Sequence, residues 1–335
     1  MDGVEAITLT VAELERDPQE ISRRSRPRTP LIRREDGTYI AMPARDVEQL
    51  ITDPRTRQME TDSMRVRGVT SGALYDFFAY SMLFTNGPAH RRRRAPLSRA
   101  FAVKLIADLR PRIRAVANEL IDAVEPRREM DLLDEYSALI PARMIADILG
   151  IEPSDVPRFT RWAYTMARAI NSSFTRADVP EIEEAARQLT AYVEEMVARR
   201  RAEPRDDLMT SFVRGVEGEG NMSAFEAAIQ LVTLILAGSD TTRAAMTMQV
   251  SLLLQHPKQW EAVCRNAALI PGAVAEALRY EPSVGSVPRF TLVDIGIDGV
   301  TVPANRLLTL STVSAMRDPE CHAEPDRFNI RRSDQ

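Results

Sequence analysis

The chain has 335 residues and a formal net charge of −4; 44% of its residues are hydrophobic and 27% are charged. This composition is that of an ordinary globular protein with a substantial core, and the net charge gives no electrostatic argument for binding nucleic acid. Two cysteines and three histidines are too few for a disulfide framework or a multi-cysteine metal site. The length is compatible with two domains or with one large domain.

The N-terminal third predicts short elements joined by turns. They are a helix over 11–24, a β-hairpin formed by 30–34 and 38–42 around Glu35-Asp36-Gly37, a helix over 46–52, and a long loop with helical pieces over 58–80. The N-terminus carries acids early, and the longest apolar run, Leu231 to Gly238, is too short to cross a bilayer. We therefore expect a cytoplasmic protein without a membrane span.

Helical patterns dominate the rest of the chain until its last fifth. Helices are predicted at about 103–124, 131–149, 154–172, 180–201, 258–267 and 271–280. Short β-branched segments follow at 287–292, 296–298, 301–302 and 307–310, with Asp298-Gly299 as a hairpin turn. The predicted fold class is mainly α with a minor sheet built from the two ends of the sequence.

One long helix is predicted from Asn221 to Pro257. Ser223 and Glu226 form a capping-box start, and Pro257 is a stop signal. A single helix of this length measures roughly 50 Å. Its flanks are apolar, but its centre contains Gly238-Ser239-Asp240-Thr241-Thr242, which are poor residues for a helix interior. Such an inconsistency is expected where a function is served.

The pair Asp240 and Thr241 admits two interpretations. In the structural one, the helix kinks and the threonine bonds to a carbonyl one turn earlier. In the functional one, Ala237 and Gly238 leave room for a flat ligand against the helix, and Asp240 and Thr241 deliver protons beside it.

Two further groups of residues could carry chemistry. Glu276 and Arg279 share a helix face, which is commonly a surface pair, and Arg327 could complete a network around Glu276. The run of four arginines after His90 is by default a solvated face. His90 and Arg94, however, lie four residues apart and could hold an anion, as could Arg289 in an otherwise apolar strand.

Six segments in this order resemble a bacterial, soluble cytochrome P450. They are GPAHRRRRAPLSRAF (87–101), AGSDTT (237–242), EALR (276–279), VPRF (287–290), AMRDP (315–319) and PDRF (325–328). Each segment is weak alone, but six in the family's order are specific. The resemblance covers the whole chain and implies one P450-like domain over 1–335. This domain has a helical body at about 87–280, a small β region from about 30–42 and 287–310, and a meander at 312–330.

The resemblance also implies roles for single residues. It places the 221–257 helix on the distal side of haem b, with Ala237 and Gly238 beside the cofactor. Asp240 and Thr241 would deliver protons. It makes Glu276, Arg279 and Arg327 a structural triad, and His90, Arg94 and Arg289 the residues that hold the haem propionates. The 58–86 loop and the region around 165–185 correspond to the segments that cover the substrate.

The family's iron ligand is a cysteine thiolate in a loop that follows the PDRF segment, and the sequence ends at Gln335 before such a loop. Cys264 and Cys321 are interpreted as small buried or half-buried thiols, and neither is nominated as a metal ligand. We therefore expect a C-terminally shortened form of a longer protein.

The leading functional hypothesis is a haem-thiolate monooxygenase. It would hydroxylate or epoxidise a small or medium organic substrate, in secondary or xenobiotic metabolism, with O₂ and electrons from a ferredoxin-type donor. Arg91 to Arg93 and Arg99 would help to dock that acidic donor. The alternatives are a non-catalytic binding or recruitment module of the same fold without haem, and a helical DNA-binding protein, which rests only on the arginine run.

Overall fold

The computed structural model describes residues 5–101, 103–170 and 174–333. The chain divides into two compact units, one formed by residues 60–244 and the other by residues 1–59 together with 245–335. The fold is mainly helical with a small sheet, as the sequence predicts, whereas the single domain over 1–335 stays a prediction.

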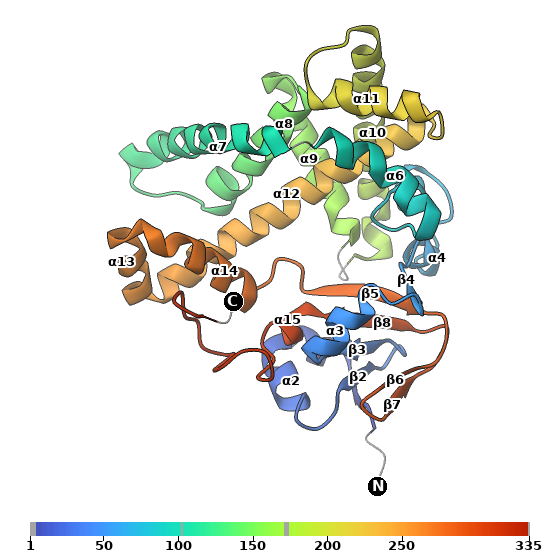
Figure 1. The fold of residues 1–335 in the computed structure, drawn as a ribbon, viewed down its shortest axis with the longest axis vertical. Helices are drawn as coiled ribbons and strands as arrows, with labels where there is room; N and C mark the ends of the chain where they lie inside the picture. Colours follow the sequence, from blue (N-terminus) through green and yellow to red (C-terminus); the bar gives the residue numbers. More distant parts are fainter. Residues whose placement is uncertain (1–4, 102, 171–173, 334–335) are drawn as a thin grey trace. The chain divides into compact units, whose positions relative to one another are not determined.

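The unit formed by the two chain ends contains the sheet (Figure 1). Six strands run in the order β1 (Ile7–Leu9), β2 (Leu31–Arg34), β3 (Tyr39–Ala41), β8 (Leu307–Ser311), β5 (Ser286–Thr291) and β4 (Thr56–Arg57). The predicted hairpin is the antiparallel pair β2–β3. Strand β3 then pairs in parallel with β8, with Tyr39 opposite Leu308. The prediction that the two ends of the sequence build one sheet is confirmed.

A second hairpin joins β6 (Ile295–Ile297) to β7 (Val300–Val302). Its turn residues Asp298 and Gly299 have φ values of 44° and 85°, the left-handed conformation that a two-residue hairpin turn requires. The prediction for this turn is confirmed. The side chains of Val302 and Leu310 are fully buried in the core beneath the sheets.

The α-helices that lie wholly within this unit are short. They are α1 (Val11–Arg16), α2 (Pro18–Ser25), α3 (Ala44–Leu50), α13 (Pro257–Arg265), α14 (Ile270–Tyr280) and α15 (Thr312–Ala315). The single helix predicted over 11–24 is wrong. The chain breaks at Asp17, whose side chain accepts a hydrogen bond from the Glu20 N–H at 3.0 Å, and Pro18 starts a second helix. A proline is best tolerated in the first turn of a helix, so Pro18 marks a start here.

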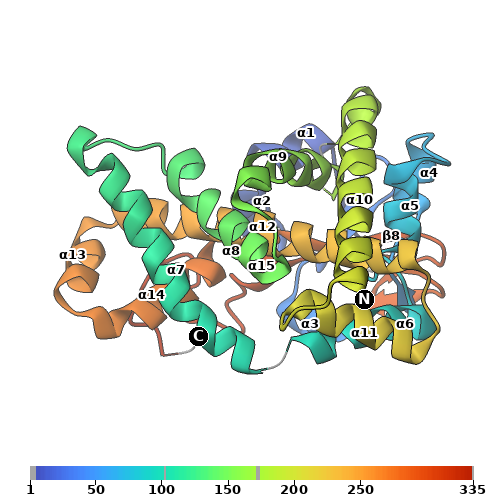
Figure 2. The same ribbon diagram turned by 90° about the horizontal axis from the view of Figure 1, so that it is seen from above.

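The unit formed by residues 60–244 is helical. Its elements are α4 (Asp62–Val66), α5 (Ala73–Tyr80), α6 (Gly87–Ala100), α7 (Val103–Val124), a π-helical segment (Leu133–Ser137), α8 (Leu139–Leu149), α9 (Val156–Ala167), α10 (Val179–Ala202), α11 (Leu208–Glu219) and the first part of α12 (Ala224–Gln255). Helix α10 contacts α9 on one side and α5 on the other (Figure 2). The helix predicted over 154–172 ends earlier, at Ala167, and residues 171–173 lie outside the described residues.

Helix α12 is continuous over 32 residues, so the predicted long helix is confirmed. Its capping box is also present: the Glu226 N–H donates to Ser223 Oγ at 3.1 Å, and the Ser223 N–H donates to Glu226 Oε2 at 3.2 Å. Leu231, Val232 and Ile235 are fully buried, and each such side chain contributes about 1.5–3 kcal/mol by leaving water. No helix within the described ranges is long and apolar enough to cross a membrane.

Glu226 also anchors α6 to the start of α12. Its carboxylate is 2.6 Å from Arg92 and 3.1 Å from Arg93. Burial raises the pKa of Glu226, but the hydrogen bonds from Arg92, from the Ser223 N–H and from Arg93 outweigh burial and bring this pKa from 4.5 to about 2. The ionised carboxylate is therefore stabilised by folding.

This lowered pKa predicts an acid-sensitive contribution to stability. Because the pKa is lower in the folded state, the contribution is fully present above about pH 4.5 and is lost as the pH falls towards 2. Glu226→Gln should lower the free energy of unfolding at pH 7 by about 2 kcal/mol. In this variant the free energy of unfolding should also decrease less steeply between about pH 4.5 and 2. Urea unfolding between pH 2 and 7 measures both effects.

Glu195→Gln is the matched control for this prediction. Glu195 belongs to an exposed pair with Arg199, with the two groups 3.7 Å apart, and such pairs contribute little. If the two variants have equal stabilities, the anchoring role of Glu226 is refuted.

Candidate functional site

The centre of α12 keeps its helical backbone through the unfavourable residues. Thr241 Oγ1 donates a hydrogen bond to the Ala237 carbonyl at 2.9 Å, the back-bond of the structural interpretation. Asp240 is 2.5 Å from Arg243, one turn further along the same helix, and 30% of its side chain is exposed. A half-exposed carboxylate next to a hydroxyl can exchange protons with solvent, so the structural and functional interpretations of this pair are compatible.

Ala237 and Gly238 lie in different environments. A Cβ atom added to Gly238 would lie 2.5 Å from Ile145 Cδ1 of α8, so the missing side chain lets α8 approach α12. Ala237 is exposed. The structure therefore gives Gly238 a packing role, and its predicted contact with a flat ligand stays a prediction. Ala237 is the small residue that remains available for such a contact.

His90 and Arg94 lie one turn apart on α6. His90 Nδ1 is 2.8 Å from the Met82 carbonyl, so a proton on Nδ1 is directed to this carbonyl and Nε2 is left for another group. Arg94 is exposed, and none of the described residues forms an ion pair with it. Both side chains therefore keep a polar group that an anion could use.

Arg289 on β5 is buried, with 8% of the residue exposed. Its guanidinium donates to the carbonyls of Ile51 at 2.5 Å and Pro288 at 3.2 Å, and burial lowers its pKa. Among the described residues no carboxylate forms an ion pair with it. A buried cation without an acid is costly, so the environment of Arg289 favours an anionic ligand.

Glu276 on α14 is completely buried and is the centre of a network. Its carboxylate accepts hydrogen bonds from Arg279 Nε at 2.7 Å, from the Asn329 N–H at 2.7 Å and from Arg332 Nε at 3.2 Å. The predicted pairing of Glu276 with Arg279 is present, and in this protein the third member of the network is Arg332.

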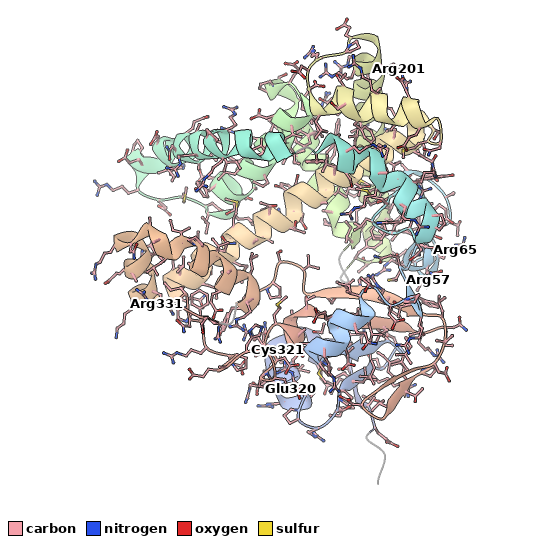
Figure 3. The ribbon with its side chains drawn as sticks, viewed as in Figure 1. Arg57, Arg65, Arg201, Glu320, Cys321 and Arg331 are labelled. Atoms are coloured by element: carbon pink, nitrogen blue, oxygen red, sulfur yellow. The ribbon has the colours of Figure 1, made fainter. Side chains whose placement is uncertain are left out.

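The prediction that Arg327 belongs to this network is wrong. Arg327 lies in a turn, pairs with Glu324 at 3.0 Å and leaves 67% of its side chain exposed, whereas the side chain of Arg332 is only 5% exposed. Arg331 is exposed, whereas Phe328 and Ile330 are buried (Figure 3). The Arg332 N–H donates to the Asn329 carbonyl at 3.1 Å, so a turn brings the Arg332 side chain to Glu276, and no regular sequence pattern marks it.

Two of the four arginines in the run are paired inside the fold. Arg92 and Arg93 pair with Glu226, and Arg99, outside the run, pairs with Glu219. These three residues were predicted to help dock an acidic donor, and their charges are already compensated by acids of the same unit. Arg91 remains exposed.

Both cysteines are exposed, so their interpretation as buried or half-buried thiols is wrong. Cys321 lies beside Glu320 in the loop after α15 (Figure 3). Partial burial and the charges of Asp318, Glu320 and Glu48 raise the pKa of its thiol, which disfavours the thiolate needed to bind a metal. Within the described part of the chain no group of three or more His, Cys, Asp or Glu residues could hold a metal ion.

Two segments assigned to substrate covering contact each other in the helical unit. The carboxylate of Glu183 on α10 accepts hydrogen bonds from the N–H groups of Ala73 at 2.7 Å and Leu74 at 3.0 Å, which cap α5. Arg67 donates to the Phe174 carbonyl at 3.1 Å. No local sequence pattern marks Glu183, because this helix cap is supplied from 110 residues away.

Comparisons with known proteins identify similar sequences and a matching family. Residues 152–334 match the family model described as Cytochrome P450. The chain is 39% identical to plant-inducible cytochrome P450-pinF1 of Rhizobium radiobacter over 96% of this chain and 76% of that protein. It is 31% identical to cytochrome P450 CYP107DY1 of Priestia megaterium over 91% and 77%.

Solved structures show the same fold. The structure of P450BioI in complex with hexadec-9Z-enoic acid ligated acyl carrier protein matches with a TM-score of 0.88 and 27% identity, over 96% of this chain and 84% of that one. The structure of CalO2 matches with a TM-score of 0.89 and 28% identity, over 97% and 81%.

The network around Glu276 predicts unequal effects for two arginines. Arg332→Ala leaves a fully buried carboxylate with one cation fewer, so it should destabilise the protein by about 3–5 kcal/mol. Arg327→Ala removes an exposed pair and should change the stability by less than about 0.5 kcal/mol. Chemical denaturation of both variants measures the difference, and equal effects would restore the original assignment of Arg327.

Proposed function

Because the chain belongs to the cytochrome P450 family, we propose that it inserts one oxygen atom from O₂ into a small or medium-sized organic substrate. It is a P450 monooxygenase, and the family's cofactor is haem b. Relatives include 6-deoxyerythronolide B hydroxylase, erythromycin C-12 hydroxylase and mycinamicin IV hydroxylase/epoxidase. These names support hydroxylation or epoxidation, in secondary or xenobiotic metabolism, as the proposed reaction.

The residues present fit the haem group. Arg289 is a buried cation whose described partners are carbonyl groups, and Arg94 is exposed without an ion pair among the described residues. In this proposal these two arginines and His90 hold the two propionate carboxylates. His90 Nδ1 faces the Met82 carbonyl, so Nε2 is the ring nitrogen that would contact a propionate. Ala237 and Gly238 would lie beside the cofactor, and neither Cys264 nor Cys321 is assigned to the iron.

The observation that carries the proposed mechanism is the pair Asp240 and Thr241. When bound, the haem supplies the iron that binds and activates O₂. Asp240 takes protons from solvent, since its carboxylate is partly exposed. Thr241 receives them, because a hydroxyl can accept one hydrogen bond while it donates another. Its present donation to Ala237 keeps the oxygen lone pairs of Thr241 available.

Members of this family use a redox partner. For this chain we propose a ferredoxin-type donor, with the exposed Arg91 as one contact for an acidic surface. A cytoplasmic location stays a prediction.

The proton-delivery role predicts the effect of Thr241→Ala in the full-length, haem-loaded protein. Consumption of O₂ should continue, while the ratio of released peroxide to organic product rises by on the order of tenfold or more, because the positioned proton carrier is lost. Electrode measurement of O₂ together with peroxide and product assays gives the ratio. Thr242→Ala is the control, because Thr242 is the exposed neighbour on the same helix. An unchanged ratio in Thr241→Ala would remove this residue from the mechanism.

Haem titration of the full-length protein distinguishes the enzyme from a non-catalytic module of the same fold. We expect stoichiometric haem and a reduced carbon-monoxide adduct with the red-shifted band of a thiolate ligand. Arg289→Gln should weaken haem retention, because a buried cation for a propionate is lost. A protein that binds no haem would instead be the binding or recruitment module.

A further inference from the structure

Arg243 lies between two side chains of the helical unit. Its Nη2 atom is 2.5 Å from Asp240 Oδ1 on α12, and the centre of its guanidinium is 4.2 Å from the ring centroid of Tyr164 on α9. Only 27% of the Arg243 side chain is exposed. An arginine can pair with a carboxylate and stack on an aromatic ring at the same time, because its charge is spread over a plane.

Tyr164 is itself fixed. Its hydroxyl donates to the carbonyl of the buried Ala138 at 2.9 Å, at the junction between the π-helical segment and α8. Burial raises the pKa of Tyr164 to about 12, so the hydroxyl keeps its proton and this hydrogen bond at neutral pH. A chain of contacts therefore runs from Ala138 through Tyr164 and Arg243 to the carboxylate of Asp240.

This chain matters because Asp240 directly precedes Thr241. A carboxylate paired with a cation has a restricted set of side-chain conformations. The cation is held in turn by a residue of α9, the helix that leads into the segment assigned to substrate covering. A shift of α9 would therefore change the position of the Asp240 carboxylate through Tyr164 and Arg243.

We propose that Arg243 and Tyr164 are positioning residues for Asp240, and that α9 controls proton delivery on α12 through them. Arg243 acts by its ion pair with the carboxylate, and Tyr164 acts by supporting the guanidinium. This inference rests on the proposed role of Asp240 in proton delivery.

The test uses the full-length, haem-loaded protein with electrons supplied by NADPH through a ferredoxin and its reductase, without added substrate. The readout is the share of consumed O₂ that is released as hydrogen peroxide. Arg243→Gln should change this share at least about twofold in the same direction as Asp240→Asn. Arg243→Lys, which keeps the charge but loses the planar group, should recover part of the wild-type value.

Two tyrosine variants separate the ring from the hydroxyl. Tyr164→Phe keeps the ring under Arg243 and should stay close to the wild type, whereas Tyr164→Leu should follow Arg243→Gln. Crystal structures give a readout apart from activity. The Asp240 carboxylate should keep its ion pair with Arg243 in Tyr164→Phe and should leave this position in Tyr164→Leu.

Arg187→Gln is the matched control. It removes an ion pair of the same spacing, Arg187 with Glu184 at 2.6 Å, from an exposed face of α10. It should leave the peroxide share unchanged.

A double-mutant cycle separates positioning from a general loss of structure. If Arg243 acts through Asp240, Arg243→Gln adds no further change in an Asp240→Asn background. Additive effects, or a wild-type value for Arg243→Gln, would overturn the inference. If Asp240→Asn itself behaves like the wild type, the proposed role of Asp240 in proton delivery is refuted. This outcome differs from one in which Asp240→Asn changes the peroxide share and Arg243→Gln does not, which refutes only the positioning role of Arg243.

Discussion

The burial of Glu276 is the constraint on which the sheet-containing unit depends most. A carboxylate without contact to water costs several kcal/mol unless cations and N–H donors compensate it. Here Arg279 of the same helix, the Asn329 backbone and Arg332 provide this compensation. Since Arg279 also donates to the Met316 carbonyl, the segments on both sides of the 318–327 loop are tied to α14. The loop itself can stay irregular and exposed, because its two ends are fixed.

Carboxylates and arginines form many ion pairs in the described part of the chain, and a buried arginine without such a pair is informative. Glu226 holds Arg92 and Arg93, and Asp240 holds Arg243. Arg289 is buried with carbonyl groups as its described partners. A fold that pairs most of its guanidinium groups leaves a cation uncompensated at a cost, and a bound anion removes that cost.

Periodicity and capping signals predicted the elements well, because they are local. The hairpin β2–β3, the capping box at Ser223 and Glu226, and the length of α12 follow from residues close in sequence. The helix break at Asp17 was missed because an amphipathic pattern can continue across two helices. Tertiary contacts were predicted less well. The packing of Gly238 against Ile145 and the replacement of Arg327 by Arg332 depend on which face meets which neighbour, and no local pattern specifies that.

The cap that Glu183 places on α5 has a consequence for engineering. Gly72 has a φ of 99°, and a Cβ atom there would lie 2.6 Å from Glu183 Oε1, so a larger residue at this position would displace the cap as well as strain the backbone. Residues 73–80 belong to the segment that the family resemblance assigns to substrate covering, so they are a region to randomise in a search for a different substrate range. Libraries that keep Gly72 and Glu183 constant preserve the start of the helix while its side chains vary. Libraries that vary these two positions would mainly sample chains in which α5 is no longer anchored to α10.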